Sequence, residues 1–173
     1  GIGKRVTSGS FVKSLSVAPS AGSTGSKKST TGTLSADRFW IFDLASRKLV
    51  GTTSVVARVP LMVIKALLRN NPTLSFDDLD KLFNPVHNHH LPTSLGVVSK
   101  EKDVRSYYHV TYTSKGKKIK SRFYDNDPIR LATGDVVLVT NQWSLKKYED
   151  DFEEFLYIAQ ARPGFFVYDS MSK

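Results

Sequence analysis

Short apolar runs predict strands at both ends of the folded part of the chain. These runs are 38–44, 47–51, 136–139 and 165–168, and each is rich in β-branched, Leu or aromatic residues. Brief apolar runs bounded by turn residues are typical of strands. We expect the run 136–139 to be buried and to open a strand–helix–strand unit over 134–167.

Apolar residues at three- and four-residue spacing predict helices between these strands. The first helix has Pro60 in its first turn, where a missing N–H costs nothing, and ends at Asn70–Pro72. Ser75 is a suitable N-cap for a second helix. A third begins near Tyr148, carries acidic residues in its first turns and ends before Pro163.

We predict that two further stretches, 104–113 and 117–124, form the arms of a β-hairpin with Gly116 in its turn. In the second arm, apolar and small residues alternate with basic ones. The basic side chains therefore share one strand face, and they are Lys118, Lys120 and Arg122.

These elements predict an α+β fold, with a small mixed or antiparallel sheet, a basic β-hairpin and about three helices. Residues 1–33 include 19 Ser, Gly or Thr residues and should form a flexible basic tail or linker. We expect a single binding domain over 34–173, which could divide into halves at 34–99 and 100–173.

The net charge of +9 is unevenly distributed. Residues 1–36 contain five basic and no acidic residues, and residues 100–122 contain eight basic and two acidic residues. Residues 123–173, in contrast, contain five basic and nine acidic residues. Separate basic segments are typical of proteins that bind a polyanion, although ordinary solubility charge is the alternative.

The basic arm of the predicted hairpin is the first candidate site. Its cations would contact phosphates without reading base sequence. The alternative is a solvated hairpin whose edge lysines prevent strand pairing. The candidate residues are Lys115, Lys117, Lys118, Lys120 and Arg122.

Polar groups directly after the strand 136–139 form the second candidate site. The amides of Asn141 and Gln142 can pair with adenine in the major groove, and Trp143 can stack on an unpaired or flipped base. Alternatively, Trp143 is a core residue and its neighbours form a turn and a helix cap. The site is completed by Ser144, Lys146 and Lys147.

Three histidines in one loop, His87, His89 and His90, raise the question of a metal. Asp80 or Asp103 could add a carboxylate, but no helical pairing of ligands supports a zinc site. No phosphate-binding glycine loop or Ser–His–acid set is evident either. We therefore expect no cofactor and no catalytic activity in this chain, although a partner domain could be catalytic.

The chain contains no cysteine, which excludes disulfides and is compatible with a reducing compartment. No apolar run is long enough to span a bilayer, and no secretion signal is evident. We expect a cytoplasmic protein that does not enter a membrane.

Two stretches resemble known DNA-associated families. The end of the chain, which reads VVLVTNQWS and then FEEFLYIAQ before a Gly-aromatic strand, resembles small terminal modules of bacterial restriction and phage-defence proteins. The stretch RFWIFDLASRKLVG is similar to the DNA-binding domain of the replication-control protein SeqA, which reads hemimethylated adenine sites. The resemblance implies DNA binding that is sensitive to sequence or modification, in a bacterial or phage protein.

We therefore expect a DNA-binding module whose basic hairpin contacts phosphates and whose polar segment 140–144 probes bases. One alternative is a protein-interaction or oligomerisation module, with Phe165, Phe166 and the acidic helix as the partner surface. A metal-dependent nuclease that uses the histidine loop is the third hypothesis.

Overall fold

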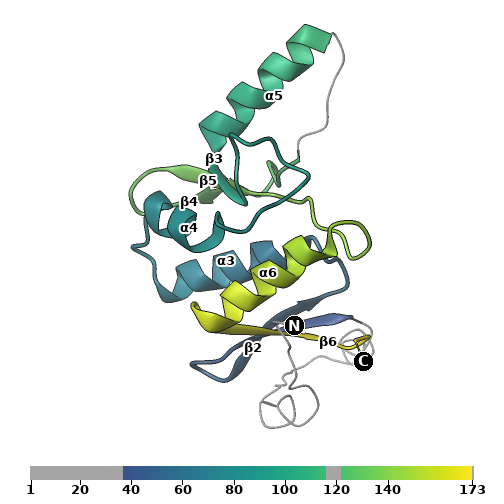
Figure 1. Cartoon of the computed structure of the whole chain (residues 1–173). Helices are drawn as coiled ribbons and strands as arrows, with labels where there is room; N and C mark the ends of the chain where they lie inside the picture. Colours follow the sequence, from purple (N-terminus) through teal and green to yellow (C-terminus); the bar gives the residue numbers. More distant parts are fainter. Residues whose placement is uncertain (1–36, 116–121, 173) are drawn as a thin grey trace, which may run out of the picture. The chain divides into compact units, whose positions relative to one another are not determined.

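The computed structural model describes residues 37–115 and 122–172, and of residues 109–115 it describes the backbone alone. Two small antiparallel sheets of three strands each and four α-helices lie within these ranges (Figure 1). The predicted α+β fold class is therefore confirmed.

Contacts divide the described chain into two compact units. The first unit contains 37–63 together with 153–172, and the second contains the residues between them. The helices α3 (Arg58–Asn70) and α6 (Glu149–Ala161) each begin in one unit and end in the other.

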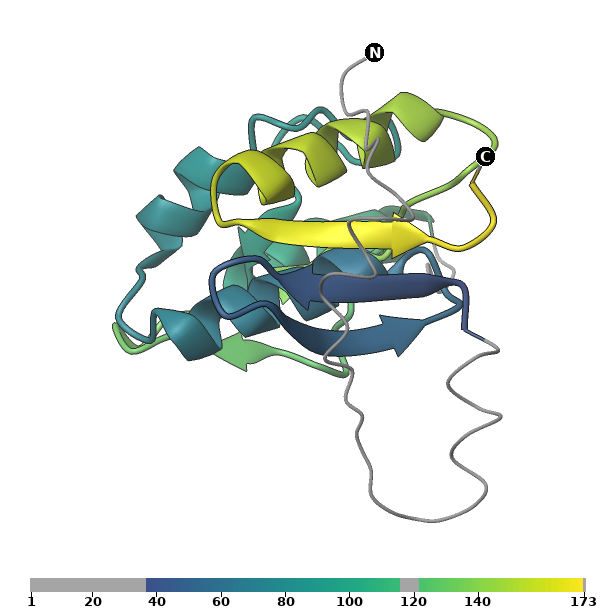
Figure 2. The same cartoon turned by 90° about the horizontal axis from the view of Figure 1, so that it is seen from below.

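The sheet of the first unit has the strand order β2-β1-β6, and Figure 2 shows its three strands side by side. Its strands are β1 (Phe39–Asp43), β2 (Lys48–Thr53) and β6 (Phe165–Asp169). The central strand β1 places Trp40 opposite Tyr168 on β6, and Phe42 opposite Phe166.

Side-chain alternation gives this sheet two apolar faces. Phe39 and Ile41 are buried on one face of β1. On the other face, Phe42 and Phe166 form a buried pair against which four partly buried side chains pack: Trp40, Leu44, Leu49 and Tyr168. A bidentate ion pair from Arg38 to Asp169, at 2.7 and 2.9 Å, links the two ends of the unit's chain.

The sheet of the second unit has the strand order β3-β5-β4. Its strands are β3 (Val98–Lys100), β4 (Ile129–Arg130) and β5 (Val136–Val139). A single bridge between Phe123 and Thr140 extends the pairing beyond β5. The unit also contains the helices α4 (Phe76–Phe83) and α5 (Glu101–Lys115).

Local sequence patterns predicted the positions of several helices and strands correctly. Strands β1, β2, β5 and β6 fall on the four predicted runs, and α3, α4 and α6 fall on the three predicted helices. At the start of α4, the Ser75 hydroxyl accepts from the Asp78 N–H at 3.2 Å, and the Asp78 carboxylate accepts from the Ser75 N–H at 2.8 Å. This reciprocal capping box explains why the helix begins where it does.

The predicted hairpin is wrong, because its first arm lies within helix α5. Val104 and Tyr108, four positions apart, pack against Phe123 and Leu138, so the apolar spacing is helical. Glu101 in the first turn also accepts from Arg105 at 2.9 Å, one helical turn later. Residues 116–121, which include Gly116 of the predicted turn and most of the predicted second arm 117–124, lie outside the described residues.

The stretch 134–167 does not form one strand–helix–strand unit. Strand β5 pairs with β3 and β4, whereas β6 pairs with β1 in the other sheet. The strand β1 that pairs with β6 lies more than a hundred residues earlier in the chain, so no local pattern in 134–167 could reveal this pairing.

Candidate nucleic-acid interface

The segment Thr140–Ser144, here called the junction, follows β5 in the second unit. Thr140 is fully buried, and its hydroxyl donates to the Arg122 carbonyl at 2.7 Å while accepting from the Gln142 N–H at 3.2 Å. The Asn141 N–H donates to the same Arg122 carbonyl at 3.1 Å. The backbone of the junction is therefore held against residue 122, which comes from the predicted basic arm.

Side chains of the same residues form a connected chain at the surface. The Arg122 guanidinium donates through Nη1 to Oε1 of Gln142 at 3.2 Å, and Nε2 of Gln142 donates to Oδ1 of Asn141 at 2.6 Å. Arg122 is exposed, and the two amides are half-buried. Since a guanidinium has five N–H donors and each amide has two, the chain retains donors for an external partner.

Arg122 also interacts with Tyr108, in the middle of α5. Burial raises the pKa of the Tyr108 hydroxyl above its ordinary value, and the positive charge of Arg122 opposes this shift. Among the described residues, this hydroxyl is the one buried side-chain polar atom without a hydrogen-bond partner. The guanidinium is therefore placed at the border between the core and the surface.

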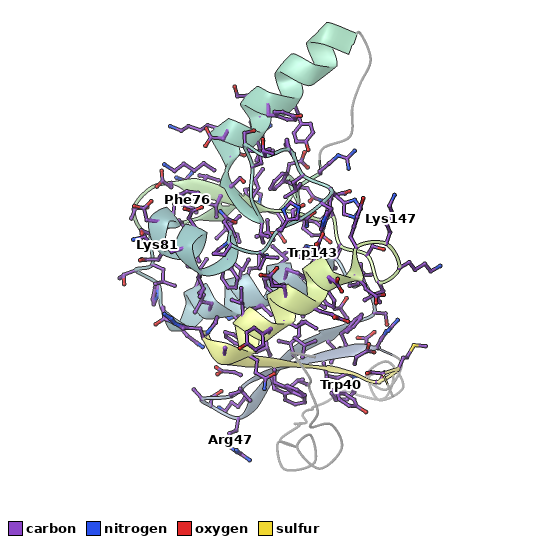
Figure 3. All side chains as sticks on the ribbon, viewed as in Figure 1. Trp40, Arg47, Phe76, Lys81, Trp143 and Lys147 are labelled. Carbon is purple, nitrogen blue, oxygen red and sulfur yellow. The ribbon has the colours of Figure 1, made fainter. Side chains whose placement is uncertain are left out.

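Trp143 faces inward from the junction. It is only 7% exposed, its indole N–H donates to the Thr140 carbonyl at 3.2 Å, and its ring meets Phe152 edge-on with centroids 6.1 Å apart. A buried indole with a satisfied N–H favours the core interpretation of Trp143 over the stacking role that we considered. Figure 3 labels Trp143 and Lys147 near the start of α6, where the Lys147 side chain projects away from the helix.

Ser144 shapes the turn that follows. Its hydroxyl accepts from the backbone N–H groups of Lys146 and Lys147 at 3.0 and 3.1 Å. Both lysine side chains are exposed, so this turn presents two adjacent cations beside the polar chain. The helix-cap interpretation of Ser144 holds in a modified form, because the serine caps a turn that precedes α6.

Tyr148, the last residue before α6, has an unusual backbone. Its φ of 62° lies in the left-handed region, which bulky residues rarely adopt. The residue is 41% exposed, and its ring stacks on the His89 ring with centroids 4.3 Å apart and planes inclined by 6°. The Lys147 ammonium lies 5.3 Å from the centroid of the same ring.

The histidine loop 87–90 lies against the junction. The buried side chain of Asn88 donates to the Gln142 carbonyl at 2.9 Å and accepts from the His90 N–H at 2.9 Å. His89 is hydrogen-bonded through its backbone N–H and its ring Nδ1 to the carboxylate of Asp151, in the first turn of α6. Within the part of the chain that the structure describes, no three His, Cys, Asp or Glu residues converge as a metal site requires.

The structure thus brings together part of both candidate sites and adds residues that sequence reasoning missed. Residues from the segment after β5 meet Arg122, which comes from before β4, in the second unit; they are Asn141, Gln142, Ser144, Lys146 and Lys147. Lys117, Lys118, Lys120 and the side chain of Lys115 lie outside the described residues. The missed residues are Tyr148 and Asp151, which the sequence placed only at the start of an acidic helix, whereas Asn88 and His89 belong to the histidine loop that was considered for a metal.

The alternative partner surface has less support from burial. Phe165 and Phe166 are 1% and 2% exposed, so neither ring is presented to a partner.

Comparison of the chain with protein-family models, with curated proteins and with solved structures found no match. Among the described helices, none combines the length and apolar character needed to cross a membrane.

Proposed function

We propose that this chain is a DNA-binding module, of the kind found in bacterial or phage restriction and defence proteins, that senses base sequence or methylation. The observation that carries the proposal is the connected chain Arg122–Gln142–Asn141, flanked by the exposed Lys146 and Lys147. This arrangement combines the groups that position a protein on a duplex with groups that discriminate bases.

The proposed roles follow from the chemistry of each group. Lys146 and Lys147 contact phosphates. Arg122 pairs with guanine, and the amides of Gln142 and Asn141 pair with adenine, since these are the geometries that the major groove favours. The N-terminal segment and residues 115–120 add positive charge that strengthens binding to any sequence.

A salt titration with duplex DNA tests the phosphate contacts. The logarithm of the affinity should fall linearly with the logarithm of the salt concentration, and replacing Lys146 and Lys147 by Ala should lower the slope by roughly 0.9 for each phosphate that is no longer neutralised. The matched control replaces two other exposed lysines, Lys48 and Lys81, and removes the same charge. A flat salt dependence, or an equal decrease in the control, would contradict the proposal.

Selection from random methylated and unmethylated duplexes tests the base contacts. Gln142→Ala should change preference at one base position by about 1–3 kcal/mol while leaving the salt slope unchanged. If the variant weakens all sequences equally, Gln142 does not read bases.

A further inference from the structure

A buried carboxylate holds the ring and backbone of one loop histidine. Asp151 Oδ2 accepts from the His89 backbone N–H at 2.9 Å, and Asp151 Oδ1 lies 2.8 Å from His89 Nδ1. The carboxylate side chain is 5% exposed, whereas the imidazole is 41% exposed. Asp151 therefore fixes the orientation of a ring that solvent and ligands can reach.

The contact with Asp151 also fixes which nitrogen carries the proton. A carboxylate can only accept, so Nδ1 of His89 must be the N–H donor. Neutral His89 then has an acceptor at Nε2, and only the protonated ring has an N–H there. Consequently Nε2 can donate to an anion only when His89 is positively charged.

The neighbouring groups make an anion a suitable partner for that nitrogen. Tyr148 stacks on the imidazole plane, and the Lys147 ammonium lies over the same tyrosine ring. The His87 ring meets the His89 ring edge-on with centroids 4.2 Å apart. The His90 ring meets the Tyr148 ring edge-on with centroids 5.2 Å apart. The first turn of α6 carries Glu149, Asp150 and Asp151, and of these Asp151 contacts His89 directly.

We propose that His89 is a phosphate ligand of the DNA-binding surface, which donates from Nε2 and takes up a proton when DNA binds. This inference rests on the proposed function, and it adds a second element, the histidine loop, to the contacts made by the junction. The buried Asp151 is a positioning residue, because it acts through His89.

Measurement of the dissociation constant of one mixed-sequence duplex against pH, at constant ionic strength, tests the inference. Between about pH 8 and about pH 5.5 the full chain should bind progressively more tightly, with a limit of about tenfold per pH unit for one proton taken up. His89→Gln should bind with a much smaller pH dependence, because glutamine does not titrate. His87→Gln and His90→Gln are the matched controls and should keep most of the dependence.

Asp151→Asn supplies a second variant that keeps an acceptor for the loop backbone but removes the negative charge. This variant should bind the duplex more weakly than the unchanged chain at low pH, because an amide can donate as well as accept and no longer fixes the His89 ring with Nδ1 as the donor. Imidazole nitrogen NMR of the unchanged chain gives a direct readout, in which adding the duplex should shift the Nε2 signal of His89 at neutral pH.

The outcomes separate the two proposals. Salt-sensitive DNA binding that does not depend on pH, or that keeps its full pH dependence in His89→Gln, overturns the role of His89 and leaves the DNA-binding proposal intact. Failure of the unchanged chain to bind DNA at any pH or salt concentration overturns both.

Discussion

The two tryptophans differ both in the polarity of their sequence neighbours and in how deeply their side chains are buried. Trp40 lies in the apolar run RFWIF of β1 yet is only partly buried, whereas Trp143 lies among polar residues in NQWS and is 7% exposed. Both indole N–H groups donate to the carbonyl three residues earlier, at 3.3 Å from Trp40 to Asp37 and 3.2 Å from Trp143 to Thr140.

This comparison shows that the polarity of flanking residues does not determine the burial of a tryptophan. In a strand, successive side chains point to opposite faces, so Trp40 can be less buried than its neighbours Phe39 and Ile41. In the junction, the polar neighbours of Trp143 satisfy one another through the bonds around Thr140 and Gln142. The indole of Trp143 is therefore buried beneath a polar surface, and no buried polar side-chain atom of the junction is left without a hydrogen-bond partner.

Trp143→Ala should have the largest effect on stability. Removing a buried aromatic side chain costs about 3–5 kcal/mol, because its apolar surface is no longer buried and a cavity remains. Trp40→Ala should cost about 1–2 kcal/mol, because its side chain is only partly removed from water. Chemical denaturation followed by far-ultraviolet circular dichroism measures both values, and an equal or larger destabilisation for Trp40→Ala would contradict the comparison.

Thr140→Val should have the next largest effect, because it removes a buried hydroxyl that makes two hydrogen bonds. Leaving the Gln142 N–H without this acceptor should lower the free energy of unfolding by about 1–3 kcal/mol. The proposed DNA binding should weaken as well, since Thr140 holds the junction against Arg122. Thr133→Val, at an exposed threonine, is the control and should change stability by less than about 0.5 kcal/mol.

Asp78→Asn should have the smallest effect, and acid should abolish it. Hydrogen bonds from the Ser75 backbone and side chain lower the pKa of Asp78 below its ordinary value. A carboxylate of this kind stabilises the fold above its unfolded pKa, and this contribution disappears as the pH falls through the lower folded pKa. The two proteins should therefore differ in thermal stability at neutral pH and converge in acid.

Asp77→Asn is the matched control for this titration, because Asp77 is adjacent and exposed but does not complete the capping box. A constant difference between Asp78→Asn and the unchanged chain at all pH values would show that the capping carboxylate does not act through its charge.

Local signals determined much of the fold. Ser75 and Asp78 define the start of α4, Pro60 fits the first turn of α3, and the apolar run at 39–43 forms β1. Each of these features depends on residues within one helical turn or one strand, where backbone geometry and hydrogen bonding are settled by near neighbours.

Only the tertiary structure decided the remainder, because the interactions involved join residues far apart in the chain. Val104 and Tyr108 form part of a helix that packs on Phe123 and Leu138, although their segment is compatible with a strand. The same holds for the candidate site. The sequence identified the polar residues 140–144 and a group of histidines separately, but the bonds from Asn88 to Gln142 and from His89 to Asp151 span 54 and 62 residues. Residue types thus indicated which groups could act, and long-range packing determined which of them meet and which, as with Trp143, support the surface from within.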